Sequence, residues 1–262
     1  MELKEKYTID DLIQIMERLR QPDGCPWDRV QTHQSIKKSL IEETYEAIDA
    51  LDFGDDKAFA NELGDVLLQV LMHADMARTD GWFTIDEVAN DICQKLIIRH
   101  PHVFGDISVS STGEVLKNWD DIKRQTKKQK SQSEAMAAIP ATYPALMKAQ
   151  KVQEKAKKAG FDWRDSQGAF DKIAEESKEL QEVLATGDKE KIEDELGDLF
   201  FSVVNTARFC GCDAETALEK ATQKFMKRFT VTEKLAAEKG IDMKEASIEV
   251  LDELWDEAKK QN

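Results

Sequence analysis

An internal repeat constrains the fold of this chain more than any other feature of its sequence. The string "ELGDVLLQVL", which starts at Glu62, is followed 133 residues later by "ELGDLFFSVV", which starts at Glu195. The same offset places "EETYE", from Glu42, over "EESKE", from Glu175. With small gaps, the match extends to "QKLIIR" over "QKFMKR" and to "EVLKNWDDIK" over "EVLDELWDEAK". Two copies of one module are therefore the most economical organisation.

The residue pattern of both copies favours helices. The chain has only five prolines, few alternating β-branched runs, and much Glu, Lys, Ala and Leu. In "TIDEVANDICQKLIIRH", Thr84 and Glu87 predict a capping box at the start of a helix with an apolar stripe. That helix is expected to end before Pro101. The predicted fold class is all-α, with two tandem modules that form four-helix-bundle-like units.

The segment between the copies predicts a linker. "RQTKKQKSQSEAMAAIPATYP" is polar and locally basic, and two prolines lie near its end. We therefore expect an amino-terminal module at residues 1–123, a linker at 124–146 and a carboxyl-terminal module at 147–262.

Charge and cysteine usage narrow the partners and the compartment. A formal net charge of −15 and a pI near 4.8 argue against nucleic acid or an anionic membrane as the main partner. The four cysteines have neither C-x-x-C spacing nor the density of a disulfide scaffold, which is typical of reduced thiols. The start of the chain has no apolar signal core, and no run is long and apolar enough to cross a bilayer. We expect a cytoplasmic protein.

The acidic residues of the first copy are arranged symmetrically about a turn. Gly54 predicts the stop between two helices. Glu46 lies eight residues before it and Glu62 eight after, while Glu43 lies eleven before and Asp65 eleven after. Since an antiparallel hairpin places equal distances at equal heights, these four carboxylates are expected to face one another in two layers about one helical turn apart.

The second copy has the same spacing about Gly187. Its four acids are Glu176, Glu179, Glu195 and Asp198, again eight and eleven residues from the glycine. A single Glu-rich string usually forms a solvated helix face. Acids placed symmetrically about a turn, in two copies, instead favour a functional site.

A cation is the expected occupant of each acidic set. Carboxylates at short range raise the pKa of one another, so a partly buried cluster stays ionised only with a positive partner. Ligation by oxygen alone selects hard ions, Mg²⁺ above all with Mn²⁺ as a substitute. Di-iron bundles instead use Glu-x-x-His, which these positions lack.

The rest of each "ELGD" helix also has an expected role. A helix-interior glycine costs about 1 kcal/mol against Ala and is tolerated where something comes close. For Gly64 and Gly197 we expect the facing helix or a ligand. The apolar run that follows is expected to be buried.

These strings resemble the EExxE…ExxD signature of the MazG-type, all-α nucleoside triphosphate pyrophosphohydrolases. The resemblance covers nearly the whole chain and includes "GCPWD", "QKLIIRHPHVFGD", "PALMKAQKVQEKAKKAGFDW" and "ELWDEAK". The chain is similar to the bacterial form of the family, which has two domains in tandem. The flanking strings make the resemblance far more specific than the acidic motif alone.

The resemblance implies Mg²⁺-dependent hydrolysis of a nucleoside triphosphate to the monophosphate and pyrophosphate. The family's metal ligands correspond to Glu43, Glu46, Glu62 and Asp65 in the first copy and to Glu176, Glu179, Glu195 and Asp198 in the second. Glu42 and Glu175, the leading acids, are candidates to orient or deprotonate the attacking water. The resemblance also implies a homodimer, which would bury the apolar faces of the hairpins.

Phosphate contacts require basic residues on an otherwise acidic protein. Lys224 and Arg228 lie four apart on one predicted helix, and they recur as Lys95 and Arg99 in the first copy. We expect the second pair to bind nucleotide phosphates; the alternative is an ordinary solvated helix edge.

Two further positions are candidates for the nucleotide site, and the first of them distinguishes the copies. Lys172 lies one turn before Glu176, whereas the aligned residue of the first copy is Ser39. Trp255 is a candidate to stack on the base, with Trp119 as its counterpart and a buried core role as its alternative. Lys172 favours the carboxyl-terminal copy as the catalytic one, with catalytic candidates Glu175, Glu176 and Glu179, although the intact first quartet leaves two working sites open.

Two other functions are compatible with the sequence. One is a nucleotide sensor that keeps the ligands without turnover, and the other is a helical scaffold whose acids are surface charge. Base preference, sugar preference and any link to nucleotide clean-up or stress nucleotides have no residue that decides them.

Overall fold

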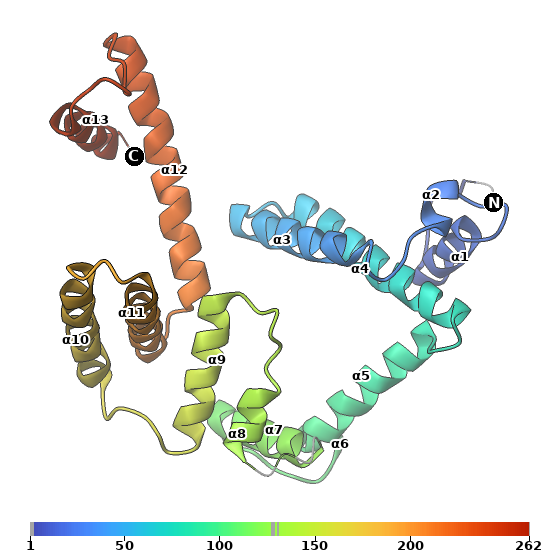
Figure 1. Cartoon of the computed structure of the whole chain (residues 1–262). Coiled ribbons are helices and arrows are strands. Elements are labelled where there is room, and N and C mark those ends of the chain that lie inside the picture. Colours follow the sequence, from blue (N-terminus) through green and yellow to red (C-terminus); the bar gives the residue numbers. More distant parts are fainter. Residues whose placement is uncertain (1–2, 127–128, 130, 262) are drawn as a thin grey trace. The chain divides into compact units, whose positions relative to one another are not determined.

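The computed structural model describes residues 3–126, 129 and 131–261, and within them it contains thirteen helices and no strand. The prediction of an all-α fold is confirmed. Contacts divide the chain into two compact units, Met1–Lys123 and Arg124–Asn262 (Figure 1). No helix among the described residues is long and apolar enough to span a membrane.

The amino-terminal unit is built on a long helical hairpin. Helix α3 packs against α4, and α1 packs on the carboxyl-terminal half of α4. Met16, Leu71 and Met76 lie in the buried cluster at that end. The helices of this unit are α1 (Ile9–Leu19), α2 (Pro26–Arg29), α3 (Lys37–Phe53), α4 (Asp56–Thr79), α5 (Ile85–Arg99), α6 (Pro101–Phe104) and α7 (Thr112–Thr126).

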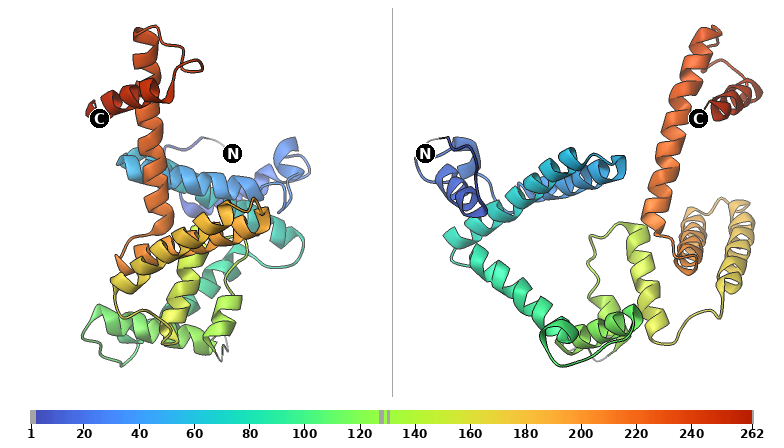
Figure 2. Two further views of the ribbon diagram at one scale, coloured as in Figure 1. Left: turned by 60° about the vertical axis from the view of Figure 1, so that its left-hand side comes forward. Right: turned by 180° about the vertical axis from the view of Figure 1, so that it is seen from behind.

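The carboxyl-terminal unit repeats the hairpin as α10 against α11, with α9 packed along α11. Helix α13 folds back on α12, where Leu235 and Leu254 form a second buried cluster. Both views of Figure 2 show α13 and the carboxyl-terminal part of α12 standing away from the α10–α11 hairpin. The helices of this unit are α8 (Gln132–Ala137), α9 (Ala145–Lys158), α10 (Ser166–Leu184), α11 (Lys189–Phe209), α12 (Ala214–Glu238) and α13 (Ile248–Lys260).

Both hairpin turns form at the predicted glycines. Gly54 ends α3 with φ 71°, and Gly187 lies between α10 and α11 with φ 68°, both in the left-handed region that favours glycine. Asp55 and Asp188 then cap the second helices, each accepting a hydrogen bond from a first-turn backbone N–H. These turns set the register in which the acids of the two helices face one another.

Local signals elsewhere are met with one exception. Thr84 and Glu87 form the predicted capping box of α5, which ends at Arg99 before the proline. The expected linker, however, contains α8, which Ser131 caps by accepting from the Glu134 N–H. A polar composition did not prevent helix formation there because the segment has a good N-cap and helix-forming residues after it.

The prediction of a buried apolar run after the acidic motif is wrong for α11 in a single chain, whereas Leu71, Met72 and Met76 are buried on α4. On α11, Phe200 is 58% exposed and Val203 46%, while Ser202 and Val204 are buried. Helix α9 covers one side of α11 only. A broad apolar face of the hairpin is therefore accessible in a single chain.

Candidate metal centre

Three acids of the amino-terminal hairpin converge across the two helices. Glu43 on α3 and Glu62 and Asp65 on α4 each offer an oxygen, and these atoms all lie within 4.8 Å of one another. All three side chains are half-buried. The fourth acid of the quartet, Glu46, lies outside this group and is exposed.

The carboxyl-terminal hairpin brings together the equivalent acids. Glu176 on α10 and Glu195 and Asp198 on α11 place ligand oxygens within 4.8 Å of one another. A second group of the same tightness joins Glu176 to Glu175 and Glu179 along α10. The buried Glu176 belongs to both groups, so it is the centre of this acidic site.

Burial and the neighbouring negative charges raise the pKa of one acid in each hairpin. The pKa of Glu43 is raised by partial burial and then by the negative charges of Asp65, Glu46 and Glu62. The pKa of Glu179 is raised by desolvation and then by the charges of Glu176 and Glu195. A positive charge close to either cluster therefore stabilises the ionised form of its carboxylates.

A lysine supplies positive charge at the carboxyl-terminal cluster. Lys172 Nζ lies 2.9 Å from Glu175 Oε1 and 2.5 Å from Glu176 Oε1. Its hydrogen bonds to Glu176 and Glu175 raise the lysine pKa, so Lys172 is charged at neutral pH. In the other hairpin the aligned residue is the uncharged Ser39, and the neighbouring Lys38 pairs with the leading acid Glu42 at 2.7 Å.

The donor set fits a hard divalent cation. Only carboxylate oxygens converge, from two helices whose register is fixed by a turn, and their mutual repulsion favours a cation. Together with the raised pKa of Glu43 and of Glu179, this chemistry suits Mg²⁺ or Mn²⁺ better than a thiol- or imidazole-seeking metal.

The predicted phosphate and base residues are grouped, but away from the acids. Lys224 and Arg228 lie on α12, and Trp255 on α13 packs its ring 5.0 Å from that of Phe225. Among the described residues, no ion pair joins Lys224 or Arg228 to an acid, and the buried Arg228 Nε has no hydrogen-bond partner. The structure does not bring these residues to the carboxylates of the same chain.

Two of the counterparts in the amino-terminal unit, Arg99 and Trp119, contact each other. The Arg99 guanidinium lies 5.3 Å from the centre of the Trp119 ring, and the His100 ring lies 4.9 Å from it. A cation–π contact of this kind occupies both the guanidinium and the aromatic face.

Of the two alternatives expected for the "ELGD" glycines, the facing helix or a ligand, the structure does not show a close approach by the facing helix. A Cβ added at Gly64 or Gly197 would meet no heavy atom within 4 Å. The space beside each of these glycines is open in a single chain, which leaves a ligand as the other expected reason.

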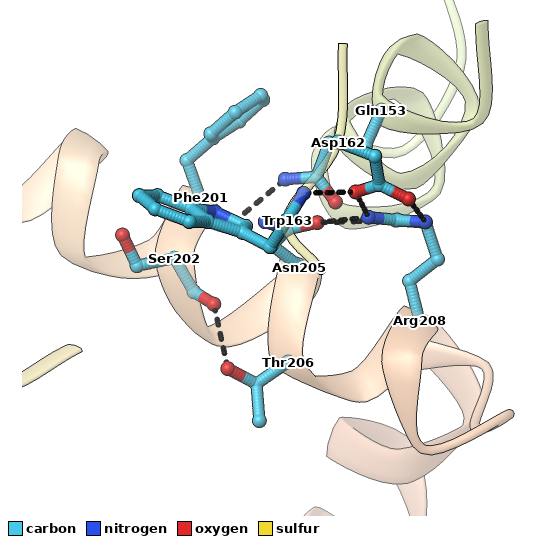
Figure 3. Close-up of polar contacts among 8 residues, drawn as sticks. All are labelled: Gln153, Asp162, Trp163, Phe201, Ser202, Asn205, Thr206 and Arg208. Carbon is cyan, nitrogen blue, oxygen red and sulfur yellow. Dashed lines mark hydrogen bonds and ion pairs between the residues drawn. The ribbon is translucent and has the colours of Figure 1, made fainter. Parts of the chain in front are cut away.

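A partly buried polar network that the sequence did not reveal fixes α11. The Arg208 guanidinium faces the Asp162 carboxylate with both nitrogens, at 3.1 and 2.5 Å, and also donates to Asn205 (Figure 3). Gln153 on α9 donates to the Phe201 carbonyl at 2.8 Å. This network ties the loop after α9 and α9 itself to the helix that carries Glu195 and Asp198.

The amino-terminal unit has the same tie with reversed charges. Arg20, at the end of α1, contacts Asp75 on α4 at 2.8 Å. Asp75 and Arg208 are matched by the 133-residue offset of the repeat. An acid aligned with a base inside two apolar helices was a signal that could have revealed both ion pairs.

Comparisons with known proteins point to one family. Residues 31–104 and residues 165–234 each match the MazG nucleotide pyrophosphohydrolase domain. The two matches contain the two acidic hairpins.

Relatives extend the similarity to nearly the full chain. A nucleoside triphosphate pyrophosphohydrolase/pyrophosphatase MazG of Thermotoga maritima is 50% identical over 250 residues, 95% of both chains. A nucleoside triphosphate pyrophosphohydrolase of Escherichia coli K12 is 43% identical over 256 residues, 97% of both chains. YabN of Bacillus subtilis, an uncharacterised protein, is 46% identical over 94% of this chain and 50% of its own.

Proposed function

The chain belongs to the MazG nucleotide pyrophosphohydrolase family, and we propose that it hydrolyses nucleoside triphosphates to the monophosphate and pyrophosphate. The relatives that match almost the full chain have names that state this activity. The observation that carries the proposal is the carboxyl-terminal cluster, in which Lys172 contacts an acidic group able to hold a divalent ion.

Four acids of this site are proposed to hold a metal ion. Glu176, Glu195 and Asp198 are the proposed metal ligands, with Glu179 completing the set. A divalent ion supplies positive charge that offsets the charge of the triphosphate and of the phosphoryl oxygens during cleavage. Mg²⁺ is the proposed physiological ion, with Mn²⁺ as a substitute.

The remaining residues bind and orient the reactants. Glu175 orients the attacking water and accepts its proton, and Lys172 holds the Glu175 and Glu176 carboxylates in place. Lys224 and Arg228 bind phosphate oxygens, and Trp255 stacks on the base.

The amino-terminal hairpin is proposed to hold a metal ion without turnover. Glu43, Glu62 and Asp65 have the same convergence, and Glu46 completes the predicted set. Ser39 replaces the lysine, and that difference favours a structural or regulatory role for this copy.

The wider setting is proposed on the same basis. The exposed apolar faces of the hairpins favour a homodimer. The free cysteines of the described residues agree with a cytoplasmic enzyme, and broad tolerance for bases would suit nucleotide clean-up or control of stress nucleotides.

Product analysis tests the proposal. The protein is incubated with Mg²⁺ and a panel of ribo- and deoxyribonucleoside triphosphates, and the products are separated by chromatography. Monophosphate with pyrophosphate is the expected result. Diphosphate with phosphate would contradict the cleavage position, and nucleotide binding without any turnover would support a sensor instead.

A further inference from the structure

Two cysteines lie close together in the turn that joins α11 to α12. Cys210 directly follows the last residue of α11, and Cys212 directly precedes Asp213, the residue that caps α12. Gly211 separates the two cysteines. Both thiols are free and exposed, and neither belongs to the proposed catalytic site. The turn therefore presents two accessible nucleophiles of the same kind.

The backbone of the turn holds the two cysteines at a distance that a disulfide can span. Gly211 has φ 70°, the Cys212 N–H donates to the Ala207 carbonyl at 2.9 Å, and the Gly211 N–H donates to the Arg208 carbonyl at 3.2 Å. These two bonds form a Schellman ending, with glycine in the left-handed conformation. That conformation mirrors the helical one, so the Cα atoms on either side of Gly211 lie about 5.4 Å apart, as for alternate residues of an α-helix. Disulfides join Cα atoms about 4.4 to 6.8 Å apart.

The Cys212 side chain also points back toward Cys210. The Cys212 thiol donates to the Cys210 carbonyl oxygen, with the two atoms 3.8 Å apart. Because the Cα separation already fits, closing a disulfide requires mainly new side-chain torsions at the two cysteines. The other two cysteines, Cys25 and Cys93, belong to the amino-terminal unit.

We propose that Cys210 and Cys212 form a reversible dithiol–disulfide site that reacts with peroxides and controls the turn between α11 and α12. Hydrogen peroxide oxidises one thiol to a sulfenic acid and leaves as water, and the second thiol then attacks that sulfur and expels a second water. The two thiols together lose two electrons and two protons, and one peroxide becomes two waters. Exchange with a small-molecule thiol restores the dithiol. In reducing compartments, disulfides are usually transient and redox-sensing.

The position of this site couples it to α12. Gln150 on α9 donates to the Cys212 carbonyl at 3.4 Å and accepts a hydrogen bond from the Ala214 N–H at 3.0 Å. New torsions at Cys212 are expected to loosen both contacts, which hold the start of α12 against α9. Helix α12 carries Lys224 and Arg228, the proposed phosphate contacts. Oxidation is therefore expected to lower turnover, and this consequence alone rests on the proposed hydrolase function.

Peptide mapping tests the site without any assay of turnover. The wild-type protein is treated with hydrogen peroxide, digested and examined by mass spectrometry. The peptide that contains Cys210 and Cys212 is expected to lose two hydrogen atoms and to regain them with dithiothreitol. Cys93, an exposed thiol on the other unit, is the internal control and is expected to form no disulfide within its own chain. Oxidation of the pair only to sulfinic acids, or only to disulfides between chains, would overturn the inference.

Hydrogen exchange tests whether the disulfide alters the turn. The amides of Cys212 and Ala214 donate to the Ala207 carbonyl and to Gln150, so their exchange reports on the Schellman ending and on the contact with α9. Both amides are expected to exchange faster in the oxidised protein than in the reduced protein. Equal exchange in the two states would show that the bond forms without controlling the turn, and would overturn that part of the inference.

Turnover measured on the same samples tests the coupling to α12. Oxidised wild type is expected to lose about fivefold or more, in the range typical of coupling between separate sites, and to recover with dithiothreitol. Cys210→Ser with Cys212→Ser is the matched control and is expected to stay within about twofold of reduced wild type before and after peroxide. An equal loss in this control would overturn the coupling. Absence of turnover in the reduced wild type would contradict the hydrolase proposal alone, since peptide mapping still decides the thiol site.

Discussion

The two acidic hairpins of the chain hold the same acids but differ in the cations around them. In each, three carboxylates from two helices offer oxygens that lie within 4.8 Å of one another. In the carboxyl-terminal hairpin, Lys172 contacts Glu176, an acid of the group that spans the two helices, whereas in the amino-terminal hairpin Lys38 pairs with the leading acid Glu42. Helical register alone preserves a set of acids through duplication, so the comparison teaches that the two hairpins differ in the position of the lysine beside the acids and not in the acids themselves.

Removing the acids of one hairpin at a time is expected to give the largest difference in turnover between the two hairpins. Glu176→Gln with Glu179→Gln is expected to lower turnover at least about 100-fold, because the metal and its charge are lost. Glu43→Gln with Glu46→Gln is expected to stay within about twofold. Steady-state pyrophosphate release measures both, and equal losses would show two working sites.

The ion pair between Asp162 and Arg208 is expected to stabilise the carboxyl-terminal unit. Arg208→Ala is expected to lower the free energy of unfolding by about 3 kcal/mol, because it leaves Asp162 without its partner in a mostly buried site. Urea unfolding followed by circular dichroism measures it. Arg164→Ala, an exposed arginine of the same loop, is the control and should change stability by less than about 0.5 kcal/mol. A loss as small as the control would mean that the network does not fix α11.

Exchanging the distinguishing residues tests the role of Lys172 directly. Lys172→Ser makes the carboxyl-terminal site resemble its duplicate and is expected to lower kcat/KM about tenfold, since a charge-assisted hydrogen bond to Glu176 is lost. Ser39→Lys is the reciprocal change and should leave turnover of the whole chain unaltered. An unchanged kcat/KM in Lys172→Ser would remove the main argument for the carboxyl-terminal site.

Proton competition gives the smallest expected effect. The folded-state pKa values of Glu43 and Glu179 lie above the ordinary 4.5, so the native protein binds extra protons in the window between 4.5 and the raised values. As pH falls through that window, the metal-free protein gains stability relative to its unfolded form and Mn²⁺ binding weakens at both hairpins. Titration calorimetry at two pH values measures this, and a Mn²⁺ affinity that rises on acidification would contradict it.

Much of this architecture follows from local signals in the sequence. The all-α fold, the turns at Gly54 and Gly187 and the capping box at Thr84 depend on neighbouring residues, which a sequence displays directly. The facing of Glu43 toward Asp65 also follows, because a short turn fixes the register of two helices.

What the sequence did not reveal depends on contacts between distant segments. The Asp162–Arg208 pair joins a loop to a helix 46 residues away, and the His33 and His73 Nδ1 atoms lie 2.7 Å apart without any motif that connects them. The apolar run after Asp198 was expected to be buried, yet burial depends on what covers the helix, and one chain covers only part of it. The separation of Lys224 from the acids likewise depends on how segments distant in the sequence are arranged, which the sequence does not display.

A Mn²⁺ titration with parallel turnover assays tests the central claim most directly. Electron paramagnetic resonance counts the bound ions in the wild type, in Glu43→Gln with Glu46→Gln, and in Glu176→Gln with Glu179→Gln. The account predicts that each variant loses the ion of its own hairpin and that turnover disappears only with the carboxyl-terminal ion. Turnover that survives loss of the carboxyl-terminal ion, or acids that bind no ion in the wild type, would contradict it.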